Sequence, residues 1–242
     1  MTNYYKTPGI IIKSREYGEA DRIFTVFTKE FGKLSLWAIS QRKIASKLRG
    51  GLALFSVLEI EFVQGKSKRI LTDAMTMASV MGIQKDLRKL QVGWKIMSLV
   101  DLLIHEEGGD SRVWHLLQDS FRVLNKYEKG DPSIGSLYQY FAWNLLSLLG
   151  YRPHLAGCIY CKQPPGEIAM YFLFSRGGLL CERCANSGNI QKGLRERHIR
   201  RVSAVTVDAI AKMLEGANAV TDESSLSRIT QSFISHIISS RV

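Results

Sequence analysis

The first 80 residues alternate between apolar and polar side chains in short runs, which is the pattern of half-buried β-strands. Leu58, Ile60 and Phe62, for example, alternate with Glu59 and Glu61. Turn-forming glycines separate the runs, so the pattern predicts five short strands. Five strands of this size are typical of a small closed barrel of OB type, and an SH3-like barrel fits the count equally well. The expected strands are residues 10–14, 22–28, 34–40, 52–63 and 69–77.

From about residue 81 the apolar positions recur every three to four residues, which indicates amphipathic helices. Leu87, Trp94 and Val100 share one stripe of a long helix that is expected to end at Gly108. The same period predicts further helices at 110–127, 131–149, 203–215 and 223–240, which would form a bundle. The expected fold class is therefore α+β, with an OB-type barrel at 1–80 and a helical domain at 81–242.

All four cysteines of the chain fall in two C-x-x-C pairs, and the pairs are separated by 19 residues. This spacing is typical of a four-cysteine zinc site, because each C-x-x-C turn aims two sulfurs at one ion and two turns complete a tetrahedron. We expect one structural zinc in a knuckle at 157–187, inserted in the helical domain; two redox pairs are the alternative. The ligands would be Cys158, Cys161, Cys181 and Cys184.

Signatures of catalysis do not occur in the sequence. Four protein ligands would leave no metal position for water, and neither C-x-x-C pair follows the proline that the P-C-x-x-C motif of zinc deaminases requires. The five histidines fall in no motif, and neither G-x-x-x-x-G-K-[ST] nor G-x-G-x-x-G is found. None of these enzyme classes is therefore indicated, and a zinc-dependent hydrolase is left as an alternative that a metal-bound water would reveal.

The net charge of the 242 residues is +11, and it is concentrated in two segments. Residues 1–80 carry a net +6 and residues 158–201 carry +5, whereas the segment between them carries only +1. Two basic regions favour a surface that neutralises phosphates, so a nucleic acid is the expected ligand. Six barrel aromatics are candidates for base stacking, although most of them must fill the core: Phe24, Phe27, Phe31, Trp37, Phe55 and Phe62.

The expected cellular location follows from the lack of membrane-spanning and export signals in the sequence. The longest apolar runs are about half the roughly 20 residues that a membrane span needs, and no export signal is visible at the N-terminus. Four clustered cysteines favour metal binding in a reducing cytosol over a disulfide framework. The cytoplasm is therefore the expected location.

The sequence resembles the bacterial RecO family of recombination mediators over nearly its whole length. The similarity includes the segment from Tyr17 to Arg22, the Phe31-Gly32-Lys33 turn, Arg42-Lys43 ahead of residues 55–60, and Gly150-Tyr151-Arg152-Pro153 before Cys158. The resemblance implies binding of single- and double-stranded DNA, annealing of complementary strands coated by single-stranded-DNA-binding protein (SSB), and cooperation with RecR to load RecA at the nucleoid. It implies no enzymatic activity.

Two sets of basic residues are the expected interaction sites. The DNA-binding set lies on the barrel and beyond the knuckle: Lys13, Arg15, Arg22, Arg42, Lys43, Lys47, Arg49, Arg195, Arg197, Arg200 and Arg201. A contact for the acidic, apolar-ended SSB tail is guessed at Arg112, Arg122 and Lys126 near Trp114 and Phe121; an ordinary amphipathic helix is the alternative. A zinc-knuckle protein that binds RNA is the competing function, because OB barrels serve both nucleic acids.

Overall fold

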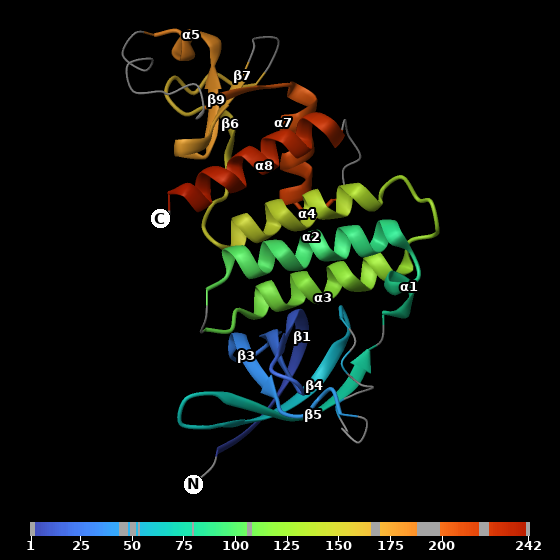
Figure 1. Ribbon diagram of the computed structural model, residues 1–242. Helices are drawn as coiled ribbons and strands as arrows, with labels where there is room; N and C mark the ends of the chain where they lie inside the picture. The colour runs from blue at the N-terminus through green and yellow to red at the C-terminus, as the bar shows by residue number, and fades with distance from the viewer. Residues whose placement is uncertain are drawn as a thin grey trace. The chain divides into compact units, whose positions relative to one another are not determined.

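The chain forms two compact units, residues 1–134 and 135–242. The structure is a computed structural model that describes residues 3–43, 48, 52, 54–78, 80–105, 108–165, 170–187, 199–217 and 223–240. Three helices belong to the same unit as the five N-terminal strands (Figure 1). The elements of this unit are β1 (Asn3–Tyr17), β2 (Asp21–Thr28), β3 (Gly32–Ala38), β4 (Val57–Gln64), β5 (Arg69–Ala78), α1 (Met81–Gln84), α2 (Leu87–Leu103) and α3 (Ser111–Lys126).

The five strands close into a barrel in the order β1-β2-β3-β5-β4, with β4 returning to β1. All neighbours are antiparallel except β3 and β5, which meet in parallel over Leu36–Trp37 and Arg69–Ile70. The prediction of five strands is confirmed, but β4 begins later than expected. Phe55 takes a left-handed φ of 68°, which interrupts the extended chain before Val57. The interior is apolar and includes Ile11, Phe24, Val26, Leu34, Leu36, Leu58, Ile60, Phe62 and Leu71.

Helices α2 and α3 pack against the barrel through aromatic contacts. The ring of Phe55 meets Trp94 of α2 and Phe121 of α3 edge to face, with centroids 5.8 and 5.5 Å apart. A Cβ atom on Gly93 would lie 2.7 Å from the Phe55 ring, so only glycine allows this approach. The contacts within this unit fix the strands of the barrel relative to α2 and α3.

The expected long helix is two helices. The short helix α1 ends at Gln84, and Asp86 then caps α2, because its side chain accepts hydrogen bonds from the backbone N–H groups of Arg88 and Lys89. The expected apolar stripe is also partly wrong, since Leu87 and Trp94 are exposed.

Lys89 occupies the buried face of α2 instead. Its Nζ donates to the carbonyl oxygens of Asn125, at 3.1 Å, and Tyr127. These carbonyls lie at the C-terminal end of α3, where the partial negative charge of the helix dipole favours a cation. The spacing of apolar residues cannot indicate a buried lysine with such partners, so the expected apolar face of α2 was partly wrong.

The second unit combines helices with a four-stranded sheet of order β6-β8-β7-β9 that the sequence analysis missed. Its core holds stacked and tilted rings of Trp143, Phe172, Phe174 and Phe233. None of the described helices in either unit is long and apolar enough to cross a membrane. The elements are α4 (Ile134–Leu148), β6 (His154–Cys158), β7 (Met170–Leu173), η1 (Phe174–Arg176), β8 (Gly178–Cys181), α5 (Glu182–Ala185), β9 (Ile199–Val202), α7 (Ala204–Leu214) and α8 (Glu223–Ser239).

Candidate metal centre and nucleic-acid interface

The four cysteines come together in the second unit. Their sulfur atoms all lie within 4.8 Å of one another, and the Sγ atoms of Cys161 and Cys181 are 3.6 Å apart. Four sulfurs placed tetrahedrally at about 2.3 Å from a zinc ion would be separated by about 3.8 Å. The donor set and its spacing therefore fit a tetrahedral thiophilic metal, and these four residues could hold one ion.

The sheet brings the two C-x-x-C pairs together. Strand β8 lies between β6 and β7, and the N–H of Ile159 donates to the carbonyl oxygen of Leu179 at 2.9 Å. Cys158 ends β6 and Cys181 ends β8, so neighbouring strand ends supply one cysteine from each pair. The second pair closes through the short helix α5, which contains Cys184.

The thiols of the cluster differ in acidity. Burial raises the pKa of the Cys158 thiol, but backbone N–H groups of Cys161, Cys181 and Tyr160 outweigh it and lower that pKa to about 6. Burial and the neighbouring sulfurs raise the pKa of Cys184 to about 12, and burial is the main cause of the raised pKa of Cys181. The thiolate of Cys158 therefore forms readily, and a positive ion would favour ionisation of Cys181 and Cys184 beside it.

Gly178 controls the spacing of β6 and β8. A Cβ atom there would lie 2.5 Å from Cγ2 of Ile159 and 3.3 Å from Cβ of His154. We expect Gly178→Ala to cost about 1–3 kcal/mol, because the two strands must separate. A thermal melt of the metal-loaded protein measures this cost. Ser175→Ala, at an exposed position of η1, is the matched control, and an unchanged melting temperature for Gly178→Ala would contradict this account of the sheet.

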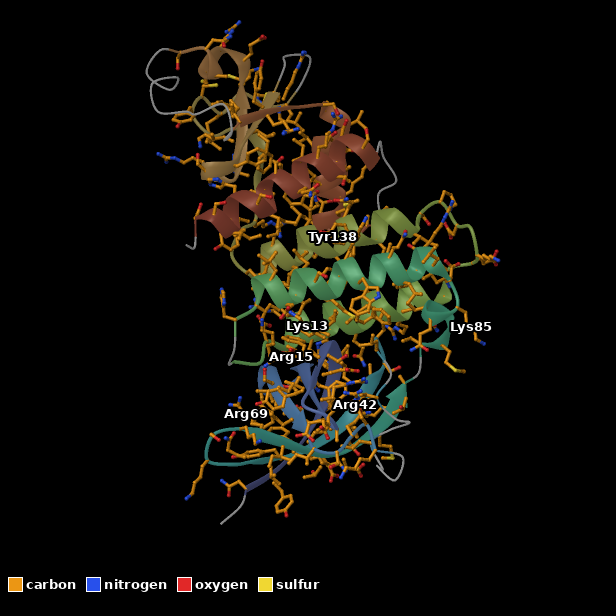
Figure 2. All side chains as sticks on the ribbon, viewed as in Figure 1. Lys13, Arg15, Arg42, Arg69, Lys85 and Tyr138 are labelled. Carbon is orange, nitrogen blue, oxygen red and sulfur yellow. The ribbon has the colours of Figure 1, made fainter. Side chains whose placement is uncertain are left out.

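Two of the expected DNA-binding residues, Lys13 and Arg15, project from β1 (Figure 2), and a third, Arg22, lies on β2. Lys13 forms an ion pair with Asp101 at 3.2 Å, and Lys33 pairs with the same carboxylate at 3.3 Å. Burial raises the pKa of Asp101, but the two lysines outweigh it and lower that pKa below its usual value. Two cations share one carboxylate, so a net positive charge remains at this point.

A second such cluster lies at the β1–β2 turn. Glu16 accepts from Arg22 at 3.3 Å and from Arg42 at 3.2 Å. The backbone N–H of Arg42 donates to the carbonyl oxygen of Ala20, which ties the segment after β3 to this turn. The structure thus brings two predicted arginines together on one carboxylate, and Lys43 beside them is exposed.

Of the six candidate aromatics, Phe24, Phe27, Phe55 and Phe62 are buried, and Phe27 lies against Trp114 of α3. Trp37 on β3 and Phe31 at the β2–β3 turn are half-buried. Strand register places Trp37 opposite Ile23, and Ile23 opposite Arg15, so Arg15 and Trp37 lie in one row on the outer face.

Two further residues complete this surface, and the sequence analysis missed both. The ring of Tyr17, which is exposed, meets Trp37 edge to face with centroids 4.5 Å apart. Lys68 Nζ, from the β4–β5 loop, lies 4.2 Å from the centroid of the Trp37 ring. We call Tyr17, Trp37 and Lys68 the aromatic platform. The sequence offered only one signal for this platform, which is a lysine, Lys68, in a loop that contains glycine.

The remaining predicted residues are placed differently. Arg200 and Arg201 are consecutive in β9, so their side chains leave opposite faces of the sheet. Arg112 pairs with Asp110 and Arg122 with Asp119. Trp114 and Phe121 are buried, so they do not share the exposed face of α3 with these cations or with Lys126. Lys47, Arg49, Arg195 and Arg197 lie outside the described residues.

Comparison with known proteins defines a class for this architecture. The model of the recombination protein O N-terminal domain matches residues 1–80, and that of its C-terminal domain matches residues 84–241. The chain is 30% identical over 234 residues to the DNA repair protein RecO of Acetivibrio thermocellus, covering 96% of this chain and 91% of the relative.

Two further relatives carry the same name. The chain is 33% identical over 183 residues to the RecO protein of Rubrobacter xylanophilus, covering 74% of this chain and 71% of the relative. It is 30% identical over 211 residues to that of a Thermoanaerobacter species, with 87% and 80% covered. The class is thus that of bacterial DNA repair proteins. The chain belongs to the RecO family, which confirms the resemblance inferred from its sequence.

Proposed function

We propose that this protein is a recombination mediator that binds DNA strands along the outer face of its barrel and anneals complementary strands. The observation that carries the proposal is the aromatic platform, with Arg15 in the same row of the outer face and the Arg22–Arg42 cluster nearby at the β1–β2 turn. Aromatic rings beside backbone-tracking cations are the combination that single-strand binding sites use. The strand order, with a parallel β3–β5 contact and a β1–β4 closure, supports the OB assignment over the SH3-like one.

Interaction energies favour replacement of the Lys68 ammonium on the Trp37 ring by a nucleobase. A cation over an exposed indole contributes about 0.5–1 kcal/mol, whereas a base stacked on an aromatic side chain contributes about 1–3 kcal/mol. A base can therefore displace Lys68 from the ring, and the released ammonium can then contact the adjacent phosphate. The platform would bind any sequence, since every base has a π-face.

Annealing follows from charge neutralisation. Two strands repel each other through their phosphates, and a protein surface with net positive clusters lowers that repulsion while the bases pair. The clusters at Glu16 and Asp101 each hold two cations on one carboxylate, and Arg15 lies between them on β1. Double-stranded DNA would bind through the same phosphate contacts.

We further propose that the four cysteines hold one structural zinc. Zinc supplies the positive charge that lets all four thiolates ionise, and four protein ligands leave it no position for a reactive water. The residues themselves fasten β6 and β8 together. The protein would then act by binding, without catalytic turnover, in the cytoplasm at the nucleoid.

The partners proposed are RecR, the acidic tail of SSB and, indirectly, RecA. Membership of a DNA repair family supports a place in recombinational repair, and these partners are the components that such a mediator must meet on coated DNA. Arg112, Arg122 and Lys126 remain the proposed contact for the SSB tail, through the exposed face of α3.

Strand annealing tests the function. Purified protein is expected to pair complementary oligonucleotides whether bare or coated with SSB, and to do so less well as salt rises. Protein dialysed against a chelator serves as the comparison for zinc. If coated strands do not anneal and structured RNA binds more tightly than DNA, the protein is an RNA-binding module and the proposal is wrong.

A further inference from the structure

An open cavity of about 290 Å³ lies at one end of the barrel. Three aromatic rings form its wall: Tyr5 stacks on Phe62 at 5.2 Å, and Phe31 meets both rings edge to face at 5.5 and 5.7 Å. Tyr5 and Phe31 are half-buried, so parts of both rings are accessible to solvent. The volume is at the lower limit for ligand sites, so it fits a single flat ring system rather than an extended ligand.

Polar groups of both signs border this aromatic cavity. Glu30 is exposed at the β2–β3 turn, and one of its carboxylate oxygens accepts from Thr7 Oγ1. Arg69 lies across the cavity on β5, where its Nε donates to Gln64 Oε1 at 3.0 Å. A carboxylate offers about four acceptor sites, so Glu30 keeps capacity for a ligand donor after the contact with Thr7.

An apolar side chain from a protein partner would fit the rings but would desolvate Glu30, Gln64 and Arg69 without replacing their hydrogen bonds. A nucleobase has a π-face for the rings and donors and acceptors on its edge for the polar groups. A carboxylate accepts from an exocyclic amino group, such as cytosine N4, and has no favourable contact with the carbonyl oxygen that thymine presents there. The cavity chemistry therefore selects a base that carries an amino group.

The cavity and the aromatic platform are adjacent along the chain. Arg69, which lines the cavity, directly follows Lys68, whose ammonium lies over the ring of Trp37. Strand register places Arg69 beside Leu36, a residue of the barrel interior, and Ile70 beside Trp37 on the outer face. One strand of DNA can therefore reach both sites around a single edge of the barrel.

We propose that the aromatic cavity captures one unstacked nucleobase bearing an exocyclic amino group from the strand held on the platform. The inference rests on the proposed function, because it requires single-stranded DNA on the barrel. It gives the protein a base preference that the platform alone does not provide, and a point at which the bound strand is held in register.

Affinity for oligo-dC and oligo-dT of equal length tests the capture. The unaltered protein is expected to favour dC by about fivefold or more, and Glu30→Gln is expected to remove most of that preference while the salt dependence stays the same. Glu59→Gln is the matched control, because Glu59 lies on β4 and pairs with Lys6 outside the cavity. A thermal melt establishes that both variants are folded.

The outcomes separate the two proposals. No binding of either oligonucleotide would overturn the proposed function itself. Binding of both with equal affinity, or a dC preference that Glu30→Gln leaves intact, would overturn the capture alone. Ligand-observed NMR with deoxycytidine monophosphate and with a phenylalanine-ended acidic peptide adds a direct test: a signal from the nucleotide that Tyr5→Leu removes supports the cavity assignment, and a signal from the peptide alone assigns the cavity to a protein partner instead.

Discussion

Replacing Cys181 with serine is expected to abolish stable zinc binding and to unfold the sheet β6-β8-β7-β9 locally. Apparent binding energies of structural zinc sites are about 10–16 kcal/mol, so one of four ligands accounts for about 3 kcal/mol, or about a hundredfold in affinity. Serine is neither a thiolate nor long enough to replace the sulfur. Because Cys181 ends the central strand β8, the loss also affects β6 and β7.

The measurement is zinc content after dialysis against a chelator, combined with limited proteolysis of the second unit. Protein with all four cysteines should keep one zinc per chain and resist cleavage at the knuckle, whereas Cys181→Ser should lose the metal and be cut there. Tyr160→Phe is the control, because Tyr160 is exposed, lies between the first two cysteines and is not one of the four expected metal ligands. Retention of zinc by Cys181→Ser at full stoichiometry would show that the four sulfurs do not form one site.

The features of this fold that the sequence predicted correctly all depend on patterns among neighbouring residues. Five β-strands followed from alternation, and Ser203 caps α7 at the residue where the expected helix begins. The cysteine cluster followed from spacing alone, since a C-x-x-C turn limits where its two sulfurs can lie. In each case the physical constraint acts over a few neighbouring residues, which a single sequence displays directly.

The errors lie where the constraint is tertiary. Lys89 is buried because the C-terminal carbonyls of α3 receive its ammonium, 36 and 38 residues away in the chain. Lys68 matters because the β3–β5 contact brings it to Trp37, and no pattern around Lys68 indicates that contact. The strands β6, β7, β8 and β9 have only four or five residues each, so alternation had too few positions to be visible.

Tertiary contacts also determine which basic side chains are free to bind DNA phosphates. Lys6 is already paired with both Glu59 and Glu61, at 2.8 and 3.1 Å, so a phosphate would have to compete with two carboxylates. Arg15, Lys66 and Lys68 form no ion pair with any acidic side chain among the residues that the structure describes. These three should therefore contribute more to phosphate binding than their paired neighbours do.

Changing Arg15, Lys66 and Lys68 together to alanine is accordingly expected to weaken binding to single-stranded DNA about a hundredfold at 0.1 M salt. Each phosphate contact contributes about 0.7 to the steepness with which log K falls against log salt, so losing three contacts should reduce the steepness by about 2. Electrostatic contacts contribute little at 1 M salt, so the two proteins should bind with similar affinity there. At 0.1 M salt, one decade lower, their affinities should then differ by about two decades. Fluorescence anisotropy of a labelled oligonucleotide across a salt series measures both quantities.

Lys6→Ala is the matched control on β1, and we expect its salt slope to stay at the value of the unaltered protein. The triple variant should lose affinity for all base compositions alike, because phosphate contacts carry no sequence information. An unchanged slope in the triple variant would place the DNA elsewhere on the protein. A reduced slope that also erased a preference for dC would show that base selection depends on these cations rather than on Glu30, because the cavity and the phosphate contacts are expected to act independently.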